Sequence, residues 1–160
     1  AKRAMGWDMK ILYVARSVHE DFEEDFGARR VELDEALAEA DFISLHVPLT
    51  EQTRHLIGAD ELAKMKSSAI LINTARGPVV DEGALVKALR DGRIAGAGLD
   101  VYENEPQMHP GLAECDRTLL LPHLGSATHQ TRADMSRLAA ENILAVLNGR
   151  QPPHAVCESN

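Results

Sequence analysis

The stretch AILINTARGPVVDEGALVKALRDGRIAGAGLD, residues 69–100, decides the fold class. It opens and closes with short apolar runs that are typical of β-strands. The residues between these runs have helical spacing, with Asp81 placed to cap the first turn and Gly92 placed to end the last. Strand, helix and strand in this order predict two parallel strands joined by a crossover helix.

The same alternation extends over the whole chain, and we find no internal repeat. Several runs are apolar on both faces, as buried parallel strands are. The sequence predicts strands at 10–14, 29–32, 42–46, 69–73, 95–100 and 118–121. It predicts helices at 34–39, 59–66, 81–91 and 128–147, and an extended tail at 151–160. The last helix is expected to bury a face formed by Met135, Leu138, Ala139, Ile143, Val146 and Leu147.

The composition fits one globular domain and argues against several classes of partner. The 160 residues are 44% hydrophobic, and 25 acidic against 17 basic residues give a formal charge of -8. This charge repels nucleic acid and anionic membrane surfaces. The chain has no apolar run near the roughly 20 residues of a membrane span and no signal-peptide core, so we expect a cytoplasmic protein. Cys115 and Cys157 suggest neither a disulfide framework nor a metal site.

Four polar segments follow candidate strands, at the edge where open α/β sheets bind ligands. They are HVPLTEQT (46–53), NTARGPVVD (73–81), GLDVYENEP (98–106) and LPHLGSAT (121–128). Taken singly, each also has an ordinary structural interpretation. Arg76 fits a surface arginine in a turn, Glu105 fits a solvated loop carboxylate, and a lone histidine such as His123 is more often structural. His46 ends a strand at the same edge, whereas the remaining histidines read as surface residues.

Taken together and in this order, the four segments resemble the D-specific 2-hydroxyacid dehydrogenases over nearly the whole chain. The stretches LPHLGSATHQTR and YVARS are most similar to glyoxylate and hydroxypyruvate reductases of that family. The resemblance implies an α/β fold with a Rossmann-type doubly wound parallel sheet. It also implies a catalytic trio of Arg76, Glu105 and His123, a small 2-keto or 2-hydroxy acid as substrate, and a homodimer.

The chemistry of keto-acid reduction suits these three residue types. The reaction needs a hydride at the carbonyl carbon, which nicotinamide supplies, and a proton at the carbonyl oxygen. A histidine can deliver the proton near neutral pH, and a neighbouring carboxylate stabilises the imidazolium form. His123 is therefore the expected acid and Glu105 its partner. Arg76 is expected to bind the substrate carboxylate and to polarise the carbonyl.

The resemblance also implies a set of cofactor contacts. They are Val47, Pro48 and Thr53 near the nicotinamide, Thr74 and Ala75 beside Arg76, Asp100 at the carboxamide, then His123, Gly125 and Ser126. NAD-preferring members place an acidic residue after the second strand to bind the adenosine ribose. Here Arg16 and Ser17 stand at that place and suit a 2′-phosphate, so we expect NADP to be preferred, with NAD possible. The alternative is that Arg16 is an ordinary solvated loop residue.

No G-x-G-x-x-G motif occurs in the chain. In a doubly wound sheet of order 3-2-1-4-5-6, that loop follows the central first strand. We therefore expect residues 1–127 to form an NAD(P)-binding domain that lacks its first strand and glycine-rich loop. Residues 128–160 are expected to form a long helix and a tail that return toward a substrate domain. That domain is expected to belong to a piece on the order of 100 to 200 residues that precedes this chain. The chain alone is expected to bind cofactor weakly and to be inactive.

Two other functions fit the same residues. Dehydrogenase-like transcriptional corepressors resemble this family, keep the trio and use the dinucleotide as a binding signal. A phosphoglycerate or formate dehydrogenase would share the scaffold and differ in its substrate domain. Turnover of keto acids by the full-length protein, set against nucleotide-dependent binding of a peptide partner, distinguishes the first alternative from an enzyme.

Overall fold

The computed structural model describes residues 1–155, and the chain forms two compact units, Ala1–Pro122 and His123–Asn160. Residues 156–160, which include Cys157 and the end of the tail, lie outside the described part. No helix in the described part is both long and apolar enough to cross a membrane.

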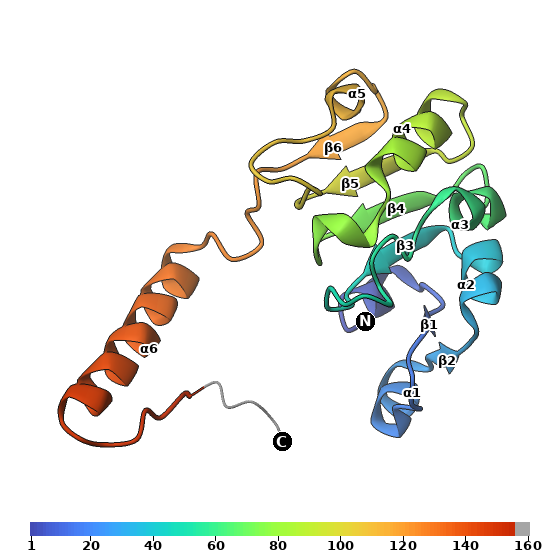
Figure 1. Ribbon diagram of the computed structural model, residues 1–160. Coiled ribbons are helices and arrows are strands. Elements are labelled where there is room, and N and C mark those ends of the chain that lie inside the picture. Colours follow the sequence, from blue (N-terminus) through green and yellow to red (C-terminus); the bar gives the residue numbers. More distant parts are fainter. Residues whose placement is uncertain (156–160) are drawn as a thin grey trace. The chain divides into compact units, whose positions relative to one another are not determined.

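The first unit is a parallel α/β structure (Figure 1), as the sequence predicts. Its main sheet has the strand order β3-β4-β5-β6, and every pairing in it is parallel. The strands are β1 (Leu12–Tyr13), β2 (Arg29–Arg30), β3 (Phe42–Leu45), β4 (Ile70–Asn73), β5 (Gly96–Leu99) and β6 (Thr118–Leu120). The helices are η1 (Ala4–Trp7), α1 (Glu20–Phe26), α2 (Leu33–Glu39), α3 (Ala59–Lys64), η2 (Gly77–Val79), α4 (Glu82–Arg90) and α5 (Pro110–Ala113).

β1 and β2 form a separate parallel pair, and among the described strands none joins β1 to β3. If β1 and β2 correspond to the second and third strands of a doubly wound sheet, the interruption falls where the first strand lies in the order 3-2-1-4-5-6. That this domain lacks its first strand stays a prediction.

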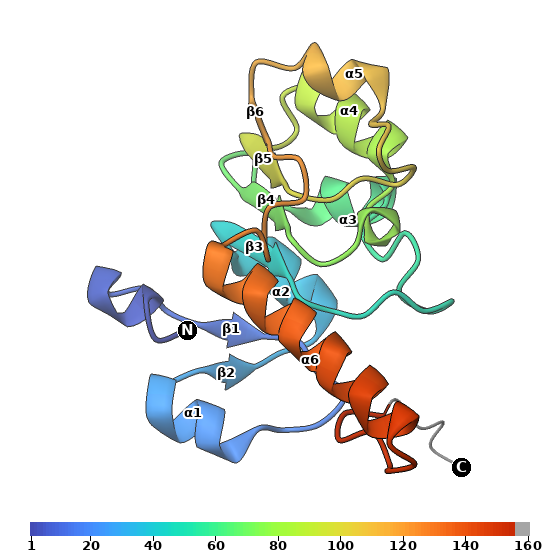
Figure 2. The ribbon, with the colours of Figure 1, turned by 90° about the vertical axis from the view of Figure 1, so that its left-hand side faces the viewer.

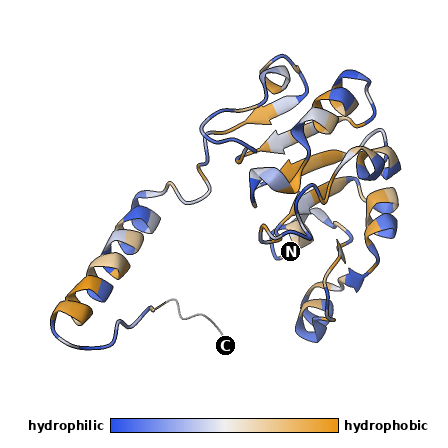
Figure 3. Ribbon diagram, viewed as in Figure 1, coloured by the Kyte–Doolittle hydropathy of each residue, from blue (hydrophilic) through white to orange (hydrophobic). Residues whose placement is uncertain are grey.

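The core lies between the main sheet and the helices α2, α3 and α4, which cover one side of it (Figures 1 and 2). Leu37, Leu62 and Leu85, one from each helix, are fully buried in the same cluster as Leu71 of β4. β4 is correspondingly among the most hydrophobic elements in Figure 3. The other side of the sheet carries an open apolar groove along β4, β5 and β6. Each strand places alternate residues on these two sides.

Helix α4 begins and ends as the sequence predicts. The Asp81 side chain accepts a hydrogen bond from the backbone N–H of Ala84 at 2.9 Å, which satisfies one of the helix's unpaired donors. Gly92 follows the helix with a φ of 66°, a conformation that costs glycine little.

The second unit contains α6 (His129–Leu147), capped by the Thr128 hydroxyl, which accepts from the Thr131 N–H at 3.1 Å. The prediction that this helix buries its apolar face is wrong for this chain. Ile143 is 60% and Leu147 77% exposed, and Met135 and Val146 are also exposed. Helical spacing shows which residues share a face but not whether another element covers it.

The short tail after α6 covers only a small part of that helix. The Asn142 side chain accepts from the His154 N–H and donates to the His154 carbonyl. This holds residues 151–155 near Ala145, the buried residue of α6. A turn at residues 153–154 interrupts the tail, so the described part is not simply extended as expected.

Candidate active site

The carboxyl ends of the main strands meet at one edge of the first unit. The parallel register sets Leu45 beside Asn73, Asn73 beside Leu99, and Leu99 beside Leu120. The predicted segments 46–53, 73–81 and 98–106 therefore leave the sheet at the same edge, together with Leu121 and Pro122. His123 is the first residue of the second unit, which also contains Gly125 and Ser126.

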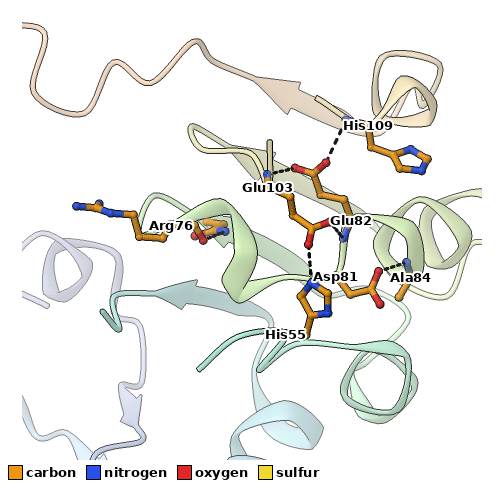
Figure 4. Close-up of polar contacts among 8 residues, drawn as sticks. His55, Arg76, Asp81, Glu82, Ala84, Glu103 and His109 are labelled. Carbon is orange, nitrogen blue, oxygen red and sulfur yellow. Dashed lines mark hydrogen bonds and ion pairs between the residues drawn. The ribbon is translucent and has the colours of Figure 1, made fainter. Parts of the chain in front are cut away.

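The loop that carries Arg76 is closed by a buried asparagine. Asn73 is 1% exposed, and its side-chain oxygen accepts from the Ala75 N–H while its amide donates to the Arg76 carbonyl, both at 3.0 Å. The two bonds fold residues 73–76 into a fixed turn. The Arg76 side chain is exposed and extends away from His55 and Glu103 (Figure 4), with one guanidinium nitrogen donating to the Ala75 carbonyl at 2.6 Å.

Gly77 packs this loop directly against the loop that carries Glu105. A Cβ atom at position 77 would lie 1.9 Å from the carbonyl carbon and oxygen of Tyr102. No other residue permits such an approach, because a side chain there would overlap the backbone of the second loop. The two loops are therefore set in position relative to one another.

Glu105 is exposed and lies before a cis peptide bond to Pro106. Its carboxylate accepts from the Tyr102 N–H at 3.0 Å, so the side chain is turned back toward the end of β5. Asp100, at that same strand end, is buried, and its N–H donates to the Asn73 carbonyl at 3.0 Å. This hydrogen bond extends the pairing of β4 and β5 to the base of both loops.

Tyr102 connects these loops to the end of β6. Its hydroxyl donates to the Leu121 carbonyl at 2.8 Å, two residues before His123. Burial raises the pKa of the Tyr102 hydroxyl, and the nearby charges of Asp100 and Glu82 raise it further. The hydroxyl therefore remains a donor at neutral pH. His123 has a φ of 54°, a left-handed conformation that is uncommon for a non-glycine residue and occurs often at functional sites.

The segment after β3 forms a compact turn. The Thr53 hydroxyl donates to the Pro48 carbonyl at 2.6 Å and accepts from the Thr50 N–H at 2.8 Å. Val47 is half-buried against the core, whereas Pro48 and Thr74 are exposed at this edge. His46 is hydrogen-bonded through its ring to the Ser44 hydroxyl on its own strand.

Arg16 and Ser17 are exposed just after β1, and a second arginine reaches the same place. Arg30, on the parallel neighbour β2, donates from Nε to the Ala15 carbonyl at 2.9 Å and from Nη2 to the Arg16 carbonyl at 3.5 Å. Arg30 could not be predicted from the sequence, because the convergence arises only from the pairing of Tyr13 with Arg30 across the two strands.

A polar cluster around Glu82 was also not predicted from the sequence. This buried carboxylate shares the inner face of α4 with Leu85, Val86 and Leu89. A charged residue in an apolar stripe was the signal that could have revealed it. His55 and His109, expected to be plain surface residues, are exposed but join the same cluster (Figure 4).

Comparison with known proteins identifies the family. Residues 1–125 match the model of the D-isomer specific 2-hydroxyacid dehydrogenase NAD binding domain. The chain belongs to this family. Its NAD-binding domain is thus the part of the family fold that contains β1 to β6.

Relatives named as reductases are similar over almost all of the chain. A glyoxylate reductase of Thermococcus litoralis is 53% identical over 98% of this chain and 47% of its own length. The chain thus spans about half the length of the curated relatives it matches.

Two solved structures of the family superpose well on the chain. The NADPH-dependent glyoxylate/hydroxypyruvate reductase of Sinorhizobium meliloti, in complex with NADP and malonate, has a TM-score of 0.83 and 37% identity, covering 91% of this chain and 45% of that one. The D-lactate dehydrogenase of Lactobacillus jensenii with NAD+ has a TM-score of 0.84 and 32% identity, covering 98% and 50%. The same domain architecture therefore serves both forms of the cofactor among these dehydrogenases.

Proposed function

We propose that the full-length protein containing this chain uses NADPH to reduce a small 2-keto acid, glyoxylate or hydroxypyruvate, to a D-2-hydroxy acid. The observation that supports this most strongly is the packing of Gly77 on Tyr102, which fixes the Arg76 loop against the Glu105 loop. The same tyrosine holds the strand end that leads to His123. The similarity to relatives named glyoxylate reductase gives the substrate class.

Each member of the trio has one task in this proposal. The Arg76 guanidinium binds the substrate carboxylate and polarises the carbonyl as negative charge develops on its oxygen. His123, as imidazolium, donates the proton to that oxygen, and the Glu105 carboxylate stabilises the imidazolium. A bound nicotinamide supplies the hydride. In the oxidative direction His123 starts neutral and accepts the proton, so lower pH favours reduction.

The residues at the carboxyl edge fit a dinucleotide. Val47, Pro48, Thr53, Thr74 and Ala75 would line the nicotinamide side, with Asp100 at the carboxamide and Gly125 and Ser126 beyond His123. At the adenosine end of the cofactor, two guanidinium groups and a hydroxyl are near the end of β1. They belong to Arg16, Arg30 and Ser17. This donor set suits a 2′-phosphate better than two ribose hydroxyls, so we favour NADP over NAD.

Turnover by the full-length protein tests the proposal. We expect NADPH-dependent reduction of glyoxylate or hydroxypyruvate, and we expect Arg16→Asp to shift the preference toward NADH. An unchanged preference would remove the argument for NADP. Nucleotide-dependent binding of a peptide without turnover would favour a corepressor, and turnover of phosphohydroxypyruvate or formate alone would favour the related dehydrogenases.

The 160-residue chain by itself is expected to be inactive. Glycine-rich loops hold the pyrophosphate with backbone N–H groups at a helix N-terminus, and this sequence has no such loop. Measurable glyoxylate reduction by the purified chain would contradict this expectation. A cytoplasmic setting stays the expectation from the sequence, and a homodimer is the assembly that the family resemblance implies.

A further inference from the structure

Glu82 is a buried carboxylate that has no part in the chemistry described above. It is the first residue of α4 and is 3% exposed. A carboxylate removed from water is costly unless hydrogen bonds replace the lost solvation. The identity of its partners therefore shows what the residue does in the structure.

The two carboxylate oxygens of Glu82 hold the two ends of a single loop (Figure 4). Oε1 accepts from the Glu103 N–H at 2.8 Å, and Oε2 accepts from the His109 N–H at 3.0 Å. The loop between these two residues contains Glu105. One side chain thus fixes both ends of the segment that carries a member of the proposed trio.

The Glu103 side chain in turn bonds back to the start of α4. Its carboxylate accepts from the Glu82 N–H at 3.3 Å and pairs with the ring of His55. The start of α4 and the start of the loop are therefore joined by reciprocal side-chain to backbone hydrogen bonds. Because α4 is capped and packed into the core, it provides a rigid support for the loop.

We propose that Glu82 is a positioning residue that holds Glu105 in place, an inference that rests on the proposed function. Glu82 acts through backbone N–H groups and does not contact the reacting atoms. The geometry requires two acceptor oxygens at the end of a two-carbon side chain. Glutamine offers one acceptor and one donor, so it can bind only one end of the loop and meets the other with a clash of donors.

The test compares Glu82→Gln with Asp81→Ala in the full-length protein. Asp81→Ala is the matched control, because it removes the cap of the same helix but none of the bonds to the loop. Hydrogen exchange at the amides of Glu103 and His109 is measured first, since it does not depend on activity. We expect faster exchange at both amides in Glu82→Gln and unchanged exchange there in Asp81→Ala. Equal effects in the two variants, or none in Glu82→Gln, would overturn the proposal.

The kinetic test asks whether Glu82 acts through Glu105. We expect Glu82→Gln to lower kcat on the order of tenfold to a hundredfold with KM for NADPH little changed, because the displaced carboxylate no longer stabilises the imidazolium. The pH at which the reductive rate falls by half should also move downward. In a Glu105→Gln background the same change should have almost no further effect. Independent, multiplying losses would contradict a positioning role.

These measurements separate the two proposals. If the wild-type protein turns over no keto acid, the proposed function fails, and hydrogen exchange still decides whether Glu82 fixes the loop. If turnover is present and exchange rises while kcat and the pH profile stay unchanged, the loop is held by Glu82 but Glu105 is not positioned by it, and the inference is wrong.

Discussion

Gly77 lies so close to Tyr102 that a Cβ atom on the glycine would stand 1.9 Å from the tyrosine carbonyl carbon. Through this contact the loop of the proposed substrate-binding arginine rests on the loop of the proposed catalytic glutamate. Tyr102 also holds the end of β6. Three strand ends of the candidate site are thus joined at one glycine and one tyrosine.

Gly77→Ala should separate the two loops, since the three atoms that the new Cβ would strike, the Tyr102 carbonyl carbon and oxygen and the Glu103 nitrogen, all belong to the backbone. Overpacking of this kind costs about 1–3 kcal/mol of stability, and we expect kcat to fall as well. Urea unfolding and steady-state kinetics measure the two effects. Gly6→Ala is the control, because its Cβ would meet nothing within 4 Å. A Gly77→Ala variant as stable and active as Gly6→Ala would show that the close contact has no consequence.

Asn73→Ala should release the turn that presents Arg76. It leaves the Ala75 N–H and the Arg76 carbonyl without their buried partner, at a cost of roughly 1–3 kcal/mol. We expect KM for the keto acid to rise, because Arg76 loses its orientation. Asn73→Asp keeps the acceptor for the Ala75 N–H but sets a buried carboxylate oxygen against the Arg76 carbonyl, so its loss of stability should be at least as large. If both variants bind substrate like the wild type, the turn does not orient Arg76.

Arg30→Ala should weaken NADPH more than NADH, by about tenfold in kcat/KM, because one of two guanidinium groups near the expected 2′-phosphate is lost. Arg29→Ala is a matched control on the adjacent position. Its guanidinium pairs with Glu35 and Glu39 of α2 instead of reaching toward Arg16. Equal losses for the two cofactors, or the same result from both variants, would contradict a role in cofactor selection.

Tyr102→Phe should change how stability depends on alkaline pH. Burial raises the pKa of Tyr102 above its unfolded value, so the hydroxyl contributes stability that is fully present below about pH 10 and is lost as pH rises through the folded pKa. At neutral pH the variant should lose about 0.5–1.5 kcal/mol with the hydrogen bond to Leu121. Above about pH 10 the difference from wild type should shrink. Urea midpoints at both pH values provide the measurement. A constant difference would argue that the pKa of Tyr102 is not raised in the folded protein, and no loss at neutral pH would argue against the hydrogen bond.

Much of the first unit could be predicted from the sequence, because its strands are apolar and its helices have clear ends. All six strands of the described part fall within the predicted ranges, shortened at their ends. The helix α1, EDFEEDF, was not predicted; it has no side-chain cap, and its Phe22 ring contacts both Phe26 and Tyr13. Its local sequence resembles a solvated acidic loop.

The residues that support the candidate site were harder to predict than the site residues. Glu82 and Arg30 act through backbone groups that are distant in sequence or belong to a neighbouring strand, and only the charge of Glu82 within an apolar stripe hinted at a buried role. Asn73 acts on the nearby backbone of Ala75 and Arg76, but the pattern of its strand does not indicate that turn. For α6 the sequence pattern identified the residues of the apolar face, but it could not show whether another element covers that face, and in this chain the face is exposed. The roles of Arg76, Glu105 and His123 came from the family resemblance and stay proposals.

The most direct measurement is NADPH oxidation by the full-length protein with hydroxypyruvate, in the wild type and in Arg76→Ala, Glu105→Gln and His123→Asn. The proposed trio predicts turnover that His123→Asn nearly abolishes, a raised KM for the keto acid in Arg76→Ala, and a lower kcat in Glu105→Gln. It also predicts that the losses from Glu105→Gln and His123→Asn do not multiply, because the two act as a pair. Wild-type rates in the His123→Asn variant, or multiplying losses for that pair, would contradict the central claim.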